Sequence, residues 1–161
     1  MAKVEYGLQM YSLRAITGED LKGALRQVAQ MGYKYVEFAG FFGHPAEAVK
    51  SWLQEYGLVC SGTHTGGDAL AEDKLMDTIA YHKAIGCENL IIPGMDWSTE
   101  EKLDANIALM NKVQPILAEN GIQLGYHNHS GEFFPTTYGK VIEDEIIART
   151  NVALQIDTWW A

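Results

Sequence analysis

The feature that most constrains the fold is a regular alternation of short apolar runs with longer segments of helical periodicity. The apolar runs begin near residues 6, 33, 58, 89, 122 and 152, so they recur about every 30 residues, which suits βαβ units. A glycine that can end a helix in the left-handed conformation precedes four of the runs, at Gly32, Gly57, Gly86 and Gly121. The pattern therefore predicts strands and helices in strict alternation.

The expected elements follow directly from these runs. Six strands are expected, over residues 6–11, 33–38, 58–64, 89–93, 122–127 and 152–157. Five helices are expected between them, over residues 18–31, 45–56, 69–85, 98–119 and 140–149. Ser98 and Glu101 have the spacing of a capping box, and Pro115 is expected to kink the helix that this box opens or to mark its last turn. Residues 127–137 are expected to form a loop.

The architecture follows from the character of the strands. Their apolar runs are nearly continuous, which is typical of parallel strands covered on both faces. A doubly wound open sheet would need a glycine-rich phosphate loop after the first strand, but residues 10–14 read Met-Tyr-Ser-Leu-Arg. We therefore expect an α/β protein of the TIM (β/α)₈-barrel type, incomplete, with residues 1–161 as one domain that stops after the sixth strand.

Composition limits the partners. Against 12 Lys and Arg the chain has 21 Asp and Glu, a net charge of -9, which argues against binding to nucleic acid or to an anionic membrane. No apolar run approaches the ~18 residues of a membrane span, and residues 1–6 lack the apolar core of a signal peptide. A cytoplasmic protein is expected. Cys60 and Cys87 form no disulfide framework or zinc-binding pattern and are expected to be buried thiols.

Polar side chains gather where the predicted strands end, which is the functional edge of a parallel sheet. They comprise Gln9, Tyr11, Glu37, His64, Trp97, His127, His129, Glu132, Asp157 and Trp160. His127, His129 and Asp157 are the candidate metal ligands, because imidazole and carboxylate suit Mn²⁺, Fe²⁺, Co²⁺ or Zn²⁺. His127 and His129 share a face on an ideal strand, but they lie at a strand end, so whether one or both ligate stays open.

The other polar residues at this edge are candidates for catalysis or for substrate binding. Glu37, His64 and Glu132 are candidate catalytic residues; Glu132 is also a candidate for orienting a ligating histidine. Each has a plainer alternative: a salt-bridged or solvated glutamate, or a structural imidazole. The candidates for contact with a sugar substrate are Gln9, Tyr11, Trp97 and Trp160, although Trp97 alone is more often a packing residue.

Four segments together resemble the sugar phosphate isomerase/epimerase family, which has the xylose isomerase-like barrel. They are Leu-Gln-Met-Tyr-Ser-Leu-Arg at 8–14, Tyr-Val-Glu-Phe at 35–38, Gly-Tyr-His-Asn-His-Ser-Gly-Glu-Phe at 125–133 and Leu-Gln-Ile-Asp-Thr-Trp-Trp-Ala at 154–161. The resemblance implies isomerisation or epimerisation of a sugar or sugar phosphate at a divalent metal ion.

The resemblance also shows departures from the family pattern. The family takes its metal ligands, Glu, Asp, His and Glu, from strands five to eight. Asp157 matches the ligand of strand six, but the strand-five position holds His127 or His129, and the ligands of strands seven and eight fall outside this sequence. Two alternatives therefore stay open: a lyase or dehydratase acting on a keto-sugar or inosose, and a sugar- or metal-binding fragment without turnover. The open barrel edges predict a homo-oligomer.

An apurinic-site endonuclease is a further alternative on the same barrel. It would need more metal ligands and a basic surface facing DNA. The excess of acidic residues disfavours it.

Overall fold

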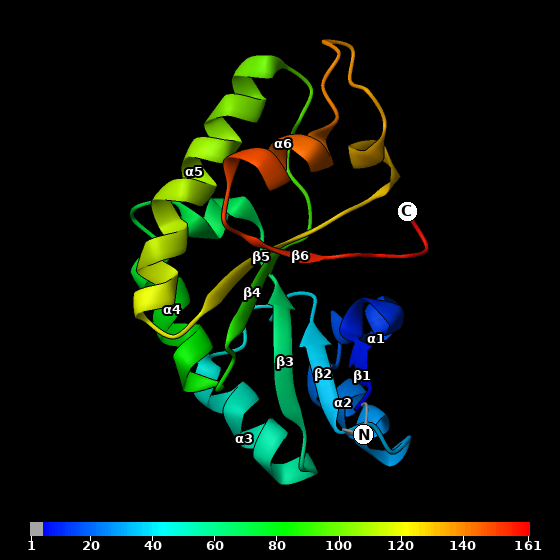
Figure 1. Ribbon diagram of the computed structural model, residues 1–161. Helices are drawn as coiled ribbons and strands as arrows, with labels where there is room; N and C mark the ends of the chain where they lie inside the picture. The colour runs from blue at the N-terminus through cyan, green and yellow to red at the C-terminus, as the bar shows by residue number, and fades with distance from the viewer. Residues whose placement is uncertain (1–4) are drawn as a thin grey trace. The chain divides into compact units, whose positions relative to one another are not determined.

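The computed structural model describes residues 5–161, and Figure 1 shows their alternating strands and helices. This part of the chain forms two compact units, residues 5–64 with 80–88 and residues 65–79 with 89–161. The prediction that no signal peptide precedes the first strand rests partly on residues 1–4, which lie outside the described residues. None of the helices described is long and apolar enough to cross a membrane.

The first unit is built on three parallel strands. They pair in chain order, β1 with β2 and β2 with β3, over Gly7–Gln9, Tyr35–Phe38 and Val59–His64. Helices α2 (Leu21–Gln30) and α3 (Ala46–Tyr56) share one apolar core with the strands. In β2, Val36 and Phe38 enter this core, so Glu37 faces the opposite side of the strand.

The second unit repeats the same arrangement. Its parallel strands pair in the order β4, β5, β6, over Asn89–Ile92, Gln123–His127 and Ala153–Gln155. Helices α5 (Glu100–Glu119) and α6 (Ile142–Arg149) lie against the same core. Leu124 and Tyr126 of β5 enter it, so His127, the last residue of this strand, faces the other side. The α/β class and the parallel strands are thus confirmed.

Several predicted element boundaries are wrong. The first strand ends at Gln9, where the Gln9 side chain accepts the Tyr11 amide; a 3-10 helix, η1 (Met10–Leu13), and a short helix, α1 (Arg14–Thr17), follow. The described residues therefore hold six helices rather than the predicted five. The predicted 69–85 helix is divided into η2 (Gly67–Leu70) and α4 (Leu75–Ala84).

Two smaller predictions also need correction. Ser98 does not cap α5: Thr99 is the N-cap, and its hydroxyl accepts the amide of Lys102. The predicted loop over 127–137 contains a third 3-10 helix, η3 (Ser130–Phe133), whose first turn is closed by Glu132. Both errors concern capping geometry, which side-chain rotamers decide and periodicity does not.

Candidate functional site

The end of β5 places His127 opposite two side chains of the next strand and its extension. His127 Nδ1 lies 3.2 Å from Gln155 Oε1, its register partner's side chain. His127 Nε2 lies 3.6 Å from Asp157 Oδ2, and the two side chains are 13% and 28% exposed. When Nδ1–H donates to the Gln155 oxygen, the Nε2 lone pair of a neutral imidazole faces the carboxylate. Two donor atoms with lone pairs facing one another are the arrangement that a cation stabilises.

Asp157 is fixed by a residue that the sequence analysis did not single out. The Asp157 amide donates to Asn128 Oδ1 at 2.8 Å, and Asn128 Nδ2 donates to the Asp157 carbonyl at 3.2 Å. Asn128 is 1% exposed, so this clamp between the ends of β5 and β6 is shielded from water. Asp157 Oδ1 accepts the Trp159 amide at 2.9 Å, which leaves Oδ2 as the oxygen facing His127.

The distance between these donors can be compared with metal geometry. Two ligand atoms about 2.1 Å from a tetrahedral Zn²⁺ ion are roughly 3.4 Å apart. The 3.6 Å between His127 Nε2 and Asp157 Oδ2 is close to that separation, so the pair fits two neighbouring positions around one ion. Across residues 5–161, however, no three His, Cys, Asp or Glu side chains form a group able to hold a metal. Within these residues, His127 and Asp157 therefore form a pair of facing donor groups and not a complete metal site.

His129 lies beyond the end of β5 and has different neighbours. Its ring meets the His127 ring edge-on, with centroids 5.1 Å apart, and the Trp160 ring at 5.7 Å. Its backbone amide donates to Glu132 Oε2 at 3.1 Å. The structure thus brings His127, His129, Asp157 and Trp160 together, with His127 as the imidazole that faces the Asp157 carboxylate.

Glu132 belongs to a buried hydrogen-bond chain. Trp97 Nε1 donates to the Tyr126 hydroxyl at 2.8 Å, and that hydroxyl donates to Glu132 Oε1, also at 2.8 Å. Burial raises the pKa of Tyr126 above its usual value, and the hydrogen bond to Glu132 adds to this. With both oxygens of Glu132 already accepting hydrogen bonds, its contacts favour orientation of the His129 segment. The contacts of Trp97 with Tyr126 favour a packing role.

The first unit carries a separate polar cluster at the ends of its strands. Gln9 Nε2 donates to Glu37 Oε2 at 2.7 Å, and His64 Nε2 lies 3.4 Å from the same oxygen. The side chains of His64 and Glu37 are 13% and 16% exposed, so the pair is largely buried but still accessible to solvent. Tyr11, in contrast, is 59% exposed and lies under the guanidinium of Arg14 rather than against this cluster.

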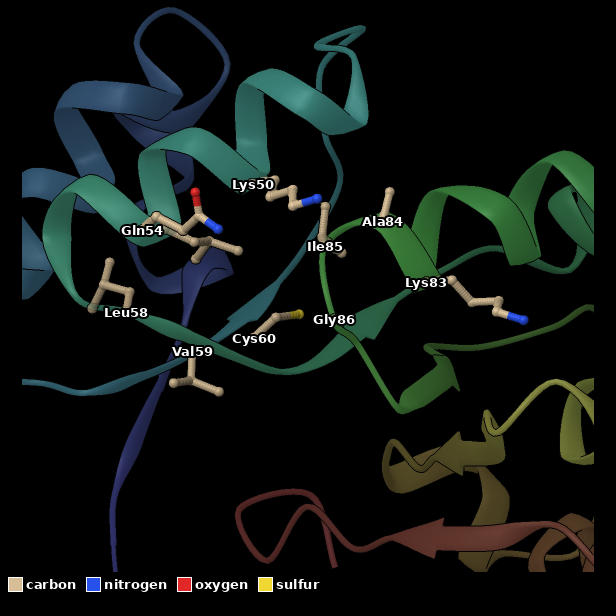
Figure 2. Close-up of a pocket in the computed structure, with 10 residues that line it drawn as sticks. Lys50, Gln54, Leu58, Val59, Cys60, Lys83, Ala84, Ile85 and Gly86 are labelled. Carbon is tan, nitrogen blue, oxygen red and sulfur yellow. The ribbon is translucent and has the colours of Figure 1, made fainter.

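A cavity of about 400 Å³ occupies a different part of the first unit. Figure 2 shows it between α3, the start of β3 and the end of α4, where Lys50, Gln54, Cys60 and Gly86 contribute to its lining. Cys60 is near the beginning of β3, whereas His64 is its last residue. None of the predicted site residues lines this cavity.

The comparisons with known proteins agree with this arrangement. The family model for the xylose isomerase-like TIM barrel matches residues 25–161. The chain belongs to this family. The six strands of the described residues, with their helices, are an incomplete TIM barrel of the xylose isomerase-like type. A search of curated protein sequences returned no significant match.

Solved structures of this family share the fold at low sequence identity. A sugar phosphate isomerase/epimerase from Parabacteroides distasonis is similar with a TM-score of 0.81 and 22% identity, over 100% of this chain and 70% of that one. An L-ribulose 3-epimerase is similar with a TM-score of 0.65 and 14% identity, over 98% of this chain and 61% of that one. A xylose isomerase-like TIM barrel protein from Mycobacterium smegmatis, in complex with magnesium, is similar with a TM-score of 0.58 and 14% identity. The similarity covers 96% of this chain and 63% of that one. This chain thus spans roughly two thirds of each of these xylose isomerase-like barrels.

Proposed function

We propose that this protein is a divalent-metal-dependent isomerase or epimerase that acts on a sugar or sugar phosphate. The observation that carries the proposal is the facing pair of His127 Nε2 and Asp157 Oδ2 at the ends of two neighbouring parallel strands. The isomerase and epimerase among the similar structures, and the magnesium complex, support it.

The proposed metal ligands of this chain are His127 and Asp157, with His129 beside them. A divalent ion supplies Lewis acidity, which polarises the carbonyl and hydroxyl oxygens of a sugar. Gln155 sets the orientation and tautomer of the His127 ring, and Asn128 holds the backbone of Asp157. Trp160, which is 44% exposed and packs on His129, offers an apolar face for a sugar ring.

Glu37 and His64 are the proposed proton-transfer pair. The Gln9 amide fixes the Glu37 carboxylate, and the His64 imidazole shares the same carboxylate oxygen. Such a pair can take a proton from the carbon next to a carbonyl and return it. Glu132, with both oxygens already accepting hydrogen bonds, is assigned the orienting role that the sequence left open.

Hydrogen exchange tests the proposed reaction. Incubation of the protein with Mn²⁺ and a panel of ketoses and ketose phosphates in D₂O should place deuterium on the carbon adjacent to the carbonyl. Glu37→Gln should abolish the exchange without weakening Mn²⁺ binding, because Glu37 is not a proposed ligand. Tight Mn²⁺ binding with no exchange on any sugar would contradict an isomerase and favour binding without turnover.

A dehydratase is the second candidate, and one observation favours it. The end of β5 presents the imidazole of His127 where the resembled family has a glutamate, so a proton shuttle between two glutamates lacks one of its groups. An enone product, detected by its ultraviolet absorbance during incubation with a keto-sugar or inosose, would identify this reaction.

A further inference from the structure

Glu143, in the first turn of α6, is the most unusual side chain outside the proposed site. It is 4% exposed, and neither of its carboxylate oxygens has a hydrogen-bond partner. A buried ionised carboxylate without partners is strongly unfavourable, so such a group takes up a proton or acquires a ligand. Both oxygens are already enclosed by the described part of the chain.

The charged groups that act most on Glu143 are acidic. Helix α6 packs against η3, which carries the buried Glu132, and the charges of Glu132 and then Asp144 act on Glu143. Besides burial, the charges of both Glu132 and Glu143 raise the pKa of the Tyr126 hydroxyl on β5. Lys140 instead pairs with Glu145.

Arg149, the basic residue in the last turn of α6, is also engaged elsewhere. Arg149 pairs with Glu145 and with Asp104 of α5. Burial, followed by the nearby Glu132, raises the pKa of Glu143 above its usual value. A bound proton is therefore the simplest way to neutralise the buried Glu143 carboxylate.

We propose that Glu143 is a positioning residue: it holds a proton that it shares with Glu132, directly or through one buried water, and so fixes the segment that carries His129. Glu132 Oε1 accepts from Tyr126, and Oε2 accepts from the His129 amide. Each oxygen has a second lone pair that can accept the Glu143 proton. Only the consequence for His129 rests on the proposed function, since the shared proton itself needs no metal or sugar.

Infrared spectroscopy tests the shared proton. At neutral pH the folded protein should show the C=O stretching band of a protonated carboxylic acid, shifted in D₂O and absent from Glu143→Gln. Glu119→Gln, the matched change at an exposed glutamate of α5, should keep the band. No such band in the wild-type protein, or a band that survives in Glu143→Gln, would overturn the proposal.

A high-resolution crystal structure separates the two geometries. A water within hydrogen-bond distance of both carboxyl groups indicates the bridged form, and direct contact between the carboxyl groups indicates the other. Either result supports the proposal. A Glu143 side chain turned to solvent, or paired with a cation, would overturn it.

Amide exchange tests the effect on His129. Glu143→Leu should accelerate hydrogen–deuterium exchange of the His129 amide at least tenfold, whereas Glu143→Gln, which keeps a hydrogen-bond donor, should not. Unchanged exchange in Glu143→Leu would refute the positioning role, and the infrared result stands even if this variant does not fold. Metal binding by the wild-type protein is a separate measurement: its absence with the band present would refute the proposed function alone.

Discussion

The hydroxyl group of Tyr126 connects the apolar core of the second unit to the segment after β5. It accepts from Trp97 Nε1 and donates to Glu132 Oε1. Tyr126→Phe should destabilise the protein by about 1–3 kcal/mol, because it leaves the buried Glu132 carboxylate and the partly buried Trp97 indole N–H with one partner fewer. Urea unfolding measures the change. Tyr138→Phe, which removes a hydrogen bond to the Trp97 carbonyl in a partly buried position, is the control and should lose less. An equal loss in both variants would contradict the central position of Tyr126.

The raised pKa of Glu143 makes the stability of the folded protein depend on pH, and it fixes the direction of that dependence. Because its pKa is raised in the folded state, the folded protein binds more protons than the unfolded chain above the usual pKa of a glutamate. Stability therefore falls as the pH rises from about 4.5 toward the folded pKa, by roughly 1.4 kcal/mol for each pH unit that separates the folded from the unfolded pKa.

Glu143→Gln should remove this dependence. The variant should be more stable than the wild-type protein at pH 7, and the difference should disappear below about pH 4. Thermal unfolding across this range measures it. A variant less stable than the wild-type protein at pH 7 would show that the ionised carboxylate has a partner.

At the scale of elements, the cap of α2 provides a direct test of the local structure. Asp20 Oδ1 accepts the Gly23 amide at 2.8 Å. A β-carbon on Gly23 would lie 2.0 Å from the Asp20 carboxylate, which explains a glycine inside this helix. Asp20→Ala should cost about 1 kcal/mol of stability by loss of the cap. Chemical denaturation measures this, with Asp77→Asn at an exposed position as the control. No difference between the two variants would contradict the capping role.

The sequence predicted the strands well because their order depends on apolar runs and on glycines that end helices. It placed β3 and β4 within one residue of their observed ends. It missed η1 and η3, because 3-10 turns depend on side-chain caps such as those of Gln9 and Glu132. Periodicity carries no signal for such turns.

The candidate site could be predicted only in part. His127 and Asp157 stood out by residue type and by their place at strand ends, and the structure brings them within 3.6 Å. The sequence did not indicate a role for Asn128 or Gln155, since a side-chain amide near a strand end has no distinctive pattern until its partner is known. Glu143 resembled any polar residue of a helix, and only its burial distinguishes it.

At the scale of the whole molecule, exposed apolar side chains gather on the last strand and after it. Leu154, Ile156, Trp159 and Trp160 are 38%, 48%, 87% and 44% exposed. We expect copies of the chain to associate through this surface, because exposed apolar side chains along an edge strand favour pairing. Light scattering should give a mass above that of one chain, and Leu154→Lys with Ile156→Lys should reduce it. A monomer at high protein concentration would contradict this expectation.

Direct titration with Mn²⁺, followed by electron paramagnetic resonance, tests the central claim most directly. The wild-type protein should bind one ion, and His127→Gln and Asp157→Asn should each weaken binding by more than the roughly 10–100-fold that loss of an outer-shell partner costs. Asp77→Asn should bind as the wild-type protein does. No binding by the wild-type protein, or binding that both site variants leave unchanged, would contradict the assignment of His127 and Asp157 as metal ligands.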